Sequence, residues 1–368
     1  MLRTIGNIYD ISVSDSPIST IESGKGKGRN VLSFSSSERN SGKIVYCNYP
    51  EFIGPTKGMA FAKYSYCPNR QTVGPGEVQV FFSHHNRTGK NLWYGIQIYN
   101  PSNTTSAYVT LKNWGFGKTF DQTISPVEAF LTTTQEDPRE ITHNGVWWVL
   151  QQQIPASSSY TPFCGIIRFY VNRAVTVTSY VYENISEITG NEVVFPYSTE
   201  YADDLKVYSG YGNGFILNKT IDLNIGNMQS QGDVWYYTGE PSSWGRNVDE
   251  ITPIYLVGEN KVAKPDSSDP NLTQVGNWTT QYDFTINVTN NTGSSKRLYG
   301  FISGNSKGSN PVISADGKIK GWQSLGAQTR RWFNENIPTG VSTYKFTYMQ
   351  ASYGAAATNH AWSLSSTL

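Results

Sequence analysis

Val78-Gln-Val-Phe-Phe-Ser-His-His-Asn-Arg-Thr-Gly-Lys-Asn-Leu-Trp-Tyr-Gly-Ile-Gln-Ile-Tyr-Asn100 is the stretch that decides the fold of this 368-residue chain. Two runs rich in β-branched and aromatic residues flank a polar segment, a pattern typical of two strands joined by a turn. A segment similar to the second run recurs far downstream in the chain. This stretch therefore predicts a protein built from β-strands, and it predicts more than one unit of them.

The repeated segment covers two successive predicted strands. Residues 94–100, a polar tip and residues 108–111 align without gaps on residues 284–290, a polar tip and residues 298–301. The matched positions pair Ile96 with Ile286, Ile98 with Val288, Asn100 with Asn290 and Tyr108 with Leu298. A strand, an Asn, a polar tip and a strand are the signature of a β-hairpin, and its recurrence predicts two related β units.

The composition agrees with an all-β protein. Charged residues make up 15% of the chain, which argues against a long disordered or coiled-coil protein, because both are rich in charge. The chain contains 24 Tyr and 10 Trp, whose rings suit half-buried sheets, interfaces and sugar-stacking surfaces. Period-two alternation is clearest over residues 175–182, where Val175, Val177 and Val181 share one face.

The domain organisation follows from the spacing of these strands. We expect a Ser- and Gly-rich N-terminal arm over residues 1–40, a larger β-sandwich domain over 41–260 and a smaller one over 271–368. Residues 126–131 are the best candidate for a short helix. The predicted fold is two antiparallel β-sandwiches, jelly-roll or Ig-like, in series with little helix.

Charge and hydropathy limit the partners. The net charge is +1 with scattered Lys and Arg, whereas a nucleic-acid binder usually carries a basic stripe, so no nucleic acid is expected. No apolar run is long enough to span a bilayer, so no membrane insertion is expected. The N-terminus shows no signal peptide, which means a chain made as a soluble protein or one whose leader has been removed.

Two segments carry a resemblance to a known group of proteins. Residues 84–90, His-His-Asn-Arg-Thr-Gly-Lys, followed by 94–100, resemble the "YxHxNxTG" module of uncharacterised exported surface proteins of Gram-positive bacteria. Residues 276–282 followed by 285–290 resemble their later "GNYGxxY…N" segment. The match extends over about residues 78–350, with Phe82 and Ser83 departing from the first pattern. The resemblance implies a β fold and a surface or extracellular location, and no chemistry.

The cysteines and histidines predict no metal site. Cys47, Cys67 and Cys164 are too few for a disulfide framework, and we expect three buried thiols, with a Cys47–Cys67 disulfide as the alternative. His84 and His85 are neighbours in a strand and point to opposite faces, so both cannot bind one metal ion. We expect one of them buried and the other at the surface. No cofactor is expected either.

No residue receives a catalytic role. The chain has no GxSxG motif for a serine hydrolase, and Cys164 lies in an apolar run that would keep its thiol inert. Glycoside hydrolysis needs two carboxylates facing each other, whereas the acidic pairs here are sequence neighbours that diverge along a strand. These pairs are Asp203-Asp204, Glu136-Asp137 and Asp249-Glu250.

Aromatic residues form the candidate binding surface. Exposed rings beside Asn, Asp and Gly could stack on sugars, while the alternative is that most of them belong to a core or a domain interface. The candidate glycan-binding residues are Trp93, Tyr94, Trp114, Tyr211, Trp235, Tyr237 and Trp244. Trp147 and Trp148 are adjacent in a strand, so one is expected to face inward and the other outward.

These observations favour a non-enzymatic structural or adhesive protein of an exterior surface. The expected setting is a cell envelope, an extracellular filament or a virion appendage, so the location is extracellular, cell-surface or virion. Its expected partners are other protein subunits of a surface assembly or itself, together with surface glycans. The alternatives are a carbohydrate-binding module and an all-β glycan hydrolase or lyase.

Overall fold

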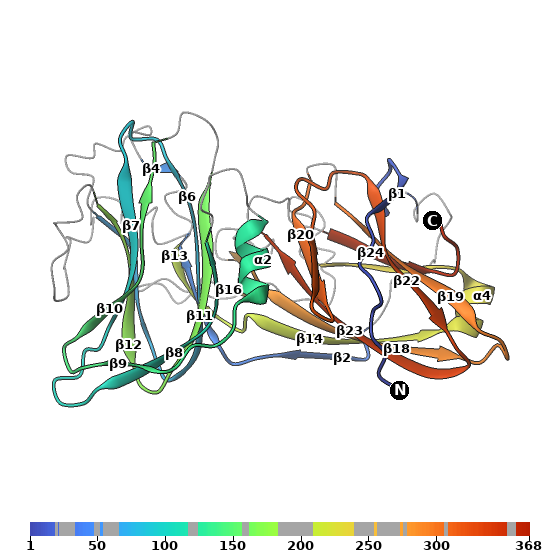
Figure 1. Ribbon diagram of the computed structural model, residues 1–368, viewed down its shortest axis with the longest axis horizontal. Helices are drawn as coiled ribbons and strands as arrows, with labels where there is room; N and C mark the ends of the chain where they lie inside the picture. Colours follow the sequence, from blue (N-terminus) through green and yellow to red (C-terminus); the bar gives the residue numbers. More distant parts are fainter. Residues whose placement is uncertain are drawn as a thin grey trace. The chain divides into compact units, whose positions relative to one another are not determined.

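The computed structural model (Figure 1) describes residues 1–18, 21, 34–47, 52–53, 66–116, 124–156, 162–182, 209–238, 254–255, 273–274, 278–304, 308–351 and 358–368. The protein is an all-β sandwich protein with little helix, as predicted. The described residues form two α-helices, α2 (Ser125–Thr132) and α4 (Ile225–Gln231). Helix α2 confirms the short helix expected at residues 126–131. It packs closely on a strand, because a Cβ at Gly115 would lie 1.8 Å from the Pro126 carbonyl oxygen.

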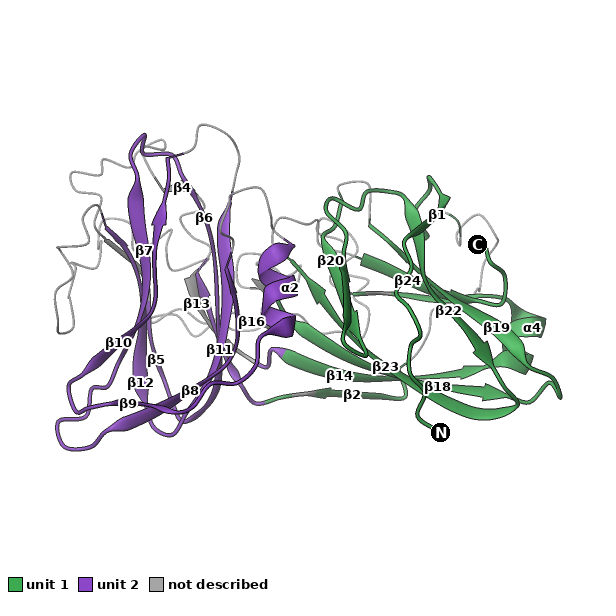
Figure 2. Cartoon of the chain, in the orientation of Figure 1, with its two compact units in different colours: residues 1–40, 216–253, 274–368 green, residues 41–215, 254–273 purple. Residues whose placement is uncertain are grey.

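The chain divides into two compact units (Figure 2). Unit 1 contains residues 1–40, 216–253 and 274–368, and unit 2 contains residues 41–215 and 254–273. The expected boundaries are therefore wrong. Residues 1–40 are no separate arm, since they supply strands β1 (Ile11–Ser14) and β2 (Ser36–Arg39) to unit 1. Residues 216–253 belong to the same unit, because β14 (Ile216–Asn224) pairs along its length with β18 (Gln281–Asn290).

Unit 2 is a sandwich of two sheets, which Figure 1 shows edge-on. One sheet has the order β10 (Val146–Ile154), β7 (Leu92–Tyr99), β12 (Val175–Tyr182), β5 (Tyr66–Val73). The other has the order β13 (Ser209–Asn213), β3 (Lys43–Cys47), β6 (Gly76–Asn86), β11 (Phe163–Val171), β8 (Ala107–Phe116), β9 (Arg139–Ile141), and β4 (Phe52–Ile53) pairs with β6. Apolar side chains between the sheets, such as Val80, Ile96 and Phe169, form one buried core.

Unit 1 is also a sandwich. Its first sheet has the order β1, β22 (Thr329–Ile337), β19 (Lys296–Ser303), β24 (Thr358–Ser363), β15 (Val234–Thr238). Its second sheet has the order β2, β14, β18, β23 (Gly340–Gln350), β20 (Pro311–Ala315), β21 (Lys318–Gly321). Its core is rich in aromatic residues, including Trp332, Phe346 and Trp362. Strand β16 (Ile254–Tyr255), which belongs to unit 2, and strand β17 (Thr273–Gln274), which contains the unit boundary, form a further small sheet.

The two sandwiches share one topology. Strands β3 and β5–β12 of unit 2 take the same sheet positions as β14, β15 and β18–β24 of unit 1, apart from the small strand β4. Each unit contains parallel pairing, β3 with β6 and β4 with β6 in unit 2 and β14 with β18 in unit 1, which the prediction of purely antiparallel sheets did not include. Two related β units are therefore present, as the repeated segment predicted.

The equivalence extends to the register of single residues. Strand β10 pairs with β7 from Val146↔Tyr99 to Ile154↔Leu92, and β22 pairs with β19 from Thr329↔Ser303 to Ile337↔Lys296. Each ladder shifts by one residue at the same place, which leaves Val149 unpaired in β10 and Trp332 unpaired in β22. A bulge is a specific local distortion of the backbone, so its recurrence makes the two ladders equivalent position by position.

The repeated segment is not a hairpin. Strands β6 and β7 lie in different sheets, as do β7 and β8, and as do β18 and β19. Each pair is an arch that crosses the sandwich from one sheet to the other. The expected alignment is wrong as well, because the β18–β19 arch corresponds to the β6–β7 arch and Asn290 therefore corresponds to Asn86, not Asn100. A hairpin and an arch share one strand–turn–strand pattern, and only long-range pairing separates them.

A buried Asn fixes the β6–β7 arch. The Asn86 Nδ2 group donates to the carbonyl oxygens of Lys90 (2.8 Å) and Ile154 (2.9 Å). Its Oδ1 atom accepts from the backbone N–H (3.1 Å) and the hydroxyl (2.7 Å) of Thr88. Since Ile154 ends β10, this side chain ties the arch to the sheet that β7 enters. Asn100 ends β7 in a similar way and donates to carbonyl oxygens across the next arch.

Asn290 repeats the bonds of Asn86 in unit 1. Its Nδ2 group donates to the carbonyl oxygens of Ser294 (2.9 Å) and Ile337 (2.8 Å), the last residue of β22. Its Oδ1 atom accepts from the N–H (3.1 Å) and hydroxyl (2.8 Å) of Thr292. Both arches have the sequence Asn-x-Thr-Gly. The Asn-x-Thr-Gly segment is therefore the sequence mark of this crossing.

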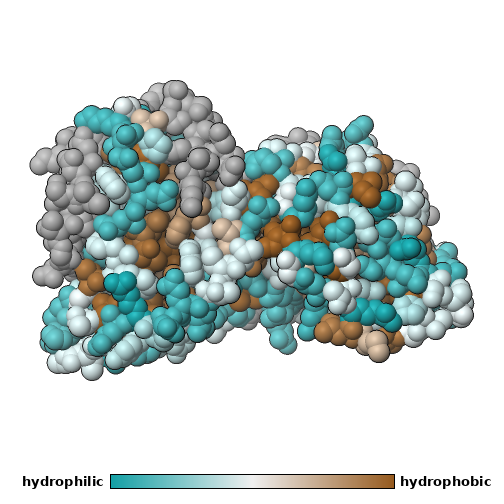
Figure 3. All heavy atoms as spheres, viewed as in Figure 1, coloured by the Kyte–Doolittle hydropathy of each residue, from teal (hydrophilic) through white to brown (hydrophobic). Residues whose placement is uncertain are grey.

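Few large apolar side chains are exposed in the described part of the chain. They are Met1, Leu2, Ile11, Tyr108, Tyr170 and Val341. On the face drawn in Figure 3, hydrophobic residues lie in separate groups between hydrophilic ones.

The N-terminal segment lies along β22 and closes that edge of its sheet. The Gly6 N–H donates to Glu335 Oε1 (2.8 Å), and the Tyr9 N–H donates to the carbonyl oxygen of Trp332 (2.8 Å). Strand β1 then pairs with β22 in antiparallel fashion. The segment therefore covers β22 along most of its length.

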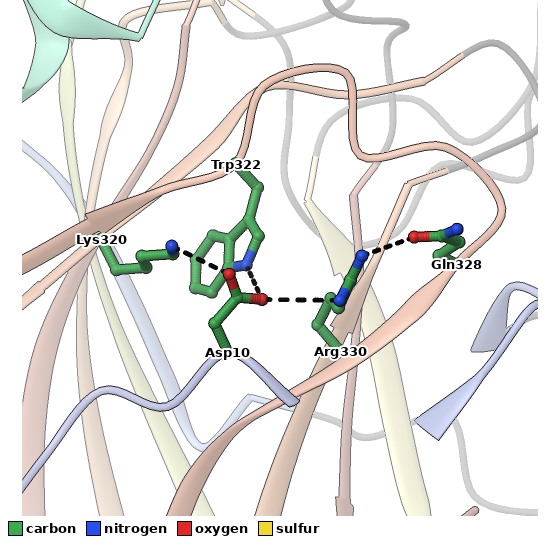
Figure 4. Close-up of polar contacts among 5 residues, drawn as sticks. All are labelled: Asp10, Lys320, Trp322, Gln328 and Arg330. Carbon is green, nitrogen blue, oxygen red and sulfur yellow. Dashed lines mark hydrogen bonds and ion pairs between the residues drawn. The ribbon is translucent and has the colours of Figure 1, made fainter. Parts of the chain in front are cut away.

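Asp10 anchors this segment beside β1 (Figure 4). Its carboxylate lies 2.8 Å from Lys320 Nζ and 3.9 Å from an Arg330 nitrogen, and it accepts a 2.8 Å hydrogen bond from Trp322 Nε1. Gln328 in turn accepts a hydrogen bond from Arg330. Burial raises the pKa of Asp10, but the hydrogen bonds and positive charges outweigh burial and hold this pKa below its ordinary value.

Candidate functional site

Four aromatic side chains cluster on the outer face of the sheet β10-β7-β12-β5. Along β7 the side chains of Tyr94, Ile96 and Ile98 enter the core, so positions 93, 95 and 97 face outward. The outward side chains of the three neighbouring strands β7, β10 and β12 meet there. We call Trp93, Trp148, Tyr180 and Tyr182 the outer aromatic cluster.

A glycine shapes this cluster. A Cβ added to Gly95 would lie 2.6 Å from Cζ3 of Trp148, so the indole lies directly over the Gly95 backbone. The Trp148 ring is 5.3 Å from the Tyr180 ring and 6.3 Å from the Tyr182 ring, and Trp93 stacks against Tyr182 at 6.4 Å with an angle of 10°. Any larger residue at position 95 would displace Trp148.

Amide side chains accompany the rings. Gln151 Nε2 donates to the Tyr182 hydroxyl at 3.4 Å, and the Tyr180 hydroxyl donates to Gln97 Oε1 at 3.4 Å. Burial raises the pKa of the Tyr182 hydroxyl, and the hydrogen bond from Gln151 partly offsets this. The phenol is therefore protonated at neutral pH. Trp93 and Trp148 are half-buried and Gln151 is exposed, so part of the cluster faces solvent.

The corresponding surface of unit 1 is built differently. Tyr299 stands in the place of Gly95, and Arg331 stands in the place of Trp148, with its guanidinium 5.2 Å from the Tyr299 ring. The C-terminal residues cover part of this face, where Arg331 donates to the carbonyl oxygen of Ser366. The aromatic arrangement around Gly95 is thus specific to unit 2.

The structure separates the residues predicted to form a binding surface. Trp93 belongs to the outer aromatic cluster. Tyr94 lies in the core, 0% exposed, and stacks on Phe82 at 4.8 Å. Trp114 is half-buried against the core of unit 2, and Trp235 is half-buried on an outer face of unit 1. Tyr94 is therefore no surface residue, and Trp114 does not belong to the outer aromatic cluster.

The side chains of three predicted residues lie outside the part of the chain that the structure describes. Tyr211 lies in β13 and Tyr237 in β15, and their side chains lie outside the described residues. Trp244 lies outside the described residues altogether. The prediction for these three residues is therefore untested.

Three members of the cluster were missing from the predicted site. They are Trp148, Tyr180 and Tyr182. The signal for the tyrosines was present, because the alternation of residues 175–182 puts them on one face of a strand. The adjacent Trp147 and Trp148 do face opposite ways, as predicted: Trp147 packs against the core of unit 2 with Arg139 4.9 Å over its ring.

The histidines are more buried than expected. His84 and His85 are both 0% exposed, so the expectation of one surface His is wrong. Strand β6 lies inside its sheet, and both of its faces are covered there. His84 Nε2 lies 3.4 Å from the Sγ atom of Cys47, which is buried, as is Cys164. The structure gives Cys47 no disulfide bond, and the side chain of Cys67, its partner in the alternative prediction, lies outside the described residues.

His360 is the buried histidine of unit 1. Burial lowers its pKa to about 3, so the ring is neutral at neutral pH. Its Nε2 atom lies 3.1 Å from the Thr238 hydroxyl, and the ring stacks on Tyr236 at 4.9 Å. Within the described ranges, no three His, Cys, Asp or Glu residues lie close enough together to hold a metal ion.

A small pocket lies beside α4. It has a volume of about 150 Å³, and its polar lining includes Asp222, Asn224, Asn227 and Gln231. Asp222 is its one carboxylate, and its Oδ1 atom accepts a hydrogen bond from Asn287. A glycoside hydrolase site needs two facing carboxylates, so this pocket does not provide one. Within the described part of the chain, no helix is long and apolar enough to cross a bilayer.

Comparisons with known proteins give no family. No protein-family model and no curated protein matches the chain. Three solved structures resemble it. Infectious bursal disease virus VP2 matches with 13% identity over 35% of this chain and 37% of that one, at a TM-score of 0.14. Bacillus subtilis oxalate decarboxylase matches with 10% identity over 93% of this chain and 79% of that one (TM-score 0.13), and the coconut allergen cocosin with 9% identity over 92% and 86% (TM-score 0.15). The chain thus spans little more than a third of the VP2 length. TM-scores this low carry no argument about function.

Proposed function

We propose that this protein is a non-enzymatic structural component of an exterior assembly, such as a cell envelope, an extracellular filament or a virion appendage. The observation that carries the proposal is the way the chain builds two sandwiches of one topology from interleaved segments. Neither unit is a continuous piece of chain, since the chain passes between them at residues 40–41, 215–216, 253–254 and 273–274.

The interleaving involves whole strands. Strand β2 lies in unit 1 although β3, the next strand, lies in unit 2, and β13 lies in unit 2 although β14 lies in unit 1. Backbone hydrogen bonds join the crossing segments: Asn40 N–H to the Ile216 carbonyl oxygen (3.0 Å) and Gly214 N–H to that of Gly42 (2.7 Å). One unit cannot unfold without disturbing segments that lead into the other. Such coupling suits a load-bearing building block.

The proposed surroundings agree with the resemblance to exported surface proteins. In that setting the partners are further protein subunits or copies of this chain, and the location is extracellular, at a cell surface or in a virion. An aromatic-rich core and buried histidines, neutral in the case of His360, suit a protein that must keep one shape in changing surroundings.

Native mass spectrometry combined with electron microscopy tests the proposal. We expect the purified protein to form dimers or larger regular assemblies as its concentration rises. A protein that stays monomeric at the highest attainable concentration, and that joins no assembly of its source, would contradict the building-block role.

Glycan binding is the second candidate function, and the outer aromatic cluster is the observation that favours it. The Trp148 indole, held over Gly95 and accompanied by Gln151, offers a flat apolar ring beside an amide, as sugar stacking needs. A glycan array with Trp148→Ala and its neighbour Trp147→Ala is a matched test, since the two rings face opposite sides of one strand. Loss of signal only in Trp148→Ala supports the site, and absence of any glycan signal for the wild type removes it.

A further inference from the structure

The equivalence of the two units exposes a difference at one sheet edge. In unit 1 the N-terminal segment covers β22, from the contact of Gly6 with Glu335 through that of Tyr9 with Trp332 to the pairing of β1 with residues 329–331. A sheet edge of this topology therefore accepts an added antiparallel strand alongside its bulged strand.

Strand β10 is the equivalent strand of unit 2. It is the last strand of its sheet, and in the part of the chain that is described it pairs with β7. The register of the two ladders makes Val146, Trp147 and Trp148 equivalent to the β22 residues that β1 covers. These three residues are half-buried. Among the described residues, unit 2 thus leaves uncovered the edge that unit 1 closes.

The chemistry of β10 indicates what pairs with it. Its nine residues, Val-Trp-Trp-Val-Leu-Gln-Gln-Gln-Ile, contain no charge and no proline, two of the features that commonly protect an edge strand from pairing. The bulge at Val149 does not prevent pairing in this topology, because β22 carries the same bulge and still pairs with β1. In β22 the edge carries Arg330, which the carboxylate of Asp10 matches on the covering segment. In β10 Trp147 stands in the place of Arg330, so the strand itself carries no charge that a partner strand would have to match.

We propose that β10 joins two copies of this chain by antiparallel pairing with the β10 of a second copy. A second β10 is a suitable partner, since the two strands carry no charged residues and therefore oppose no like charges within the strand pair. The pairing runs antiparallel, as β1 does on β22, and a two-fold axis closes it into a dimer. Main-chain hydrogen bonds supply the affinity.

The side chains beside the strand complete the contact. Trp147, with Arg139 over its ring, lies on one face of the sheet, and Trp148 lies on the other, so aromatic surface flanks the paired strands on both sides. A stable interface buries at least about 1,000 Å² in total, more than one short strand pair supplies, so these flanks must contribute. The inference rests on the proposed function and names the contact through which the assembly begins.

Sedimentation velocity over a range of concentrations tests the contact with two matched variants. Gln153→Lys adds a charge to an exposed position of β10, and Asn336→Lys adds the same charge at the register-equivalent, exposed position of β22. We expect wild type to dimerise, Gln153→Lys to weaken dimerisation at least about tenfold, and Asn336→Lys to leave it unchanged. Thermal melting checks that both variants fold.

The outcomes separate this contact from the proposed function. If wild type stays monomeric, both are overturned. If wild type assembles and Gln153→Lys assembles equally well, the β10 contact is overturned while the assembly role stands. Equal weakening by both lysine variants indicates a general charge effect and also overturns the β10 contact.

Discussion

Replacing Asn290 by Ala removes the side chain that holds the β18–β19 arch. Asn290 is 2% exposed, and its amide makes four hydrogen bonds, two with Thr292 and one each with the carbonyl oxygens of Ser294 and Ile337. The bond to Ile337 is buried, so its loss leaves a carbonyl oxygen without a partner, which costs about 1–3 kcal/mol. The other three lie near solvent, where water replaces them, and each contributes about 0.5 kcal/mol.

Together these contributions predict that Asn290→Ala lowers the free energy of unfolding by about 3 kcal/mol. Asn86→Ala should cost a similar amount in unit 2, because Asn86 makes the same four bonds. Asn290→Asp should be at least as harmful, since a carboxylate would then face two carbonyl oxygens.

Urea unfolding followed by tryptophan fluorescence measures these changes. The control is Asn291→Ala, an exposed position next to Asn290, which should change the unfolding free energy by less than about 0.5 kcal/mol. If Asn290→Ala costs no more than Asn291→Ala, the arch does not depend on its amide and the reasoning is refuted.

Two further predictions concern pH and salt. His360 has a folded-state pKa of about 3, below its unfolded value, so the free energy of unfolding should fall as pH drops from about 6.5 toward 3, by up to about 1.4 kcal/mol per pH unit. The urea midpoint of His360→Gln should depend less steeply on pH over this range than that of wild type. An equal pH dependence of the two midpoints would contradict this assignment. The lowered pKa of Asp10 means that its carboxylate stabilises the fold above its unfolded pKa and loses this effect as pH falls below it. Because Asp10 is partly exposed, Asp10→Asn should cost under about 1 kcal/mol at pH 7 and less in about 1 M salt, and a loss independent of salt would count against the ion pairs.

The sequence predicted the elements better than their partners. Alternation over residues 175–182 and the Pro-led segment 126–131 identified β12 and α2, because side-chain period and helix-start chemistry are local. The hairpin prediction failed at Asn86 and Asn290, since both a hairpin and an arch need a polar turn. What distinguishes the arch is the hydrogen bond from the Asn amide to the end of a strand more than forty residues away, and no local sequence pattern encodes such a bond.

The predicted domain boundaries failed for the same physical reason. Strand β2 looks like part of an N-terminal arm, yet its ladder with β14 joins residues far apart in the chain. The binding surface was predicted only in part. Trp93 was predicted as a member, whereas Trp148 was not, because its indole joins the cluster by lying over Gly95 on the neighbouring strand. The inward position of Tyr94 follows from the alternation of β7, which composition alone does not reveal.

Hydrogen–deuterium exchange of β10, followed against protein concentration, tests the β10 contact most directly. We predict that those amides of residues 146–148 that point away from β7 exchange quickly in dilute protein and slow down as dimers form. The equivalent residues 329–331 should exchange slowly at every concentration, because β1 already covers them. Exchange at residues 146–148 that does not change while the protein assembles would contradict the pairing of β10 between copies.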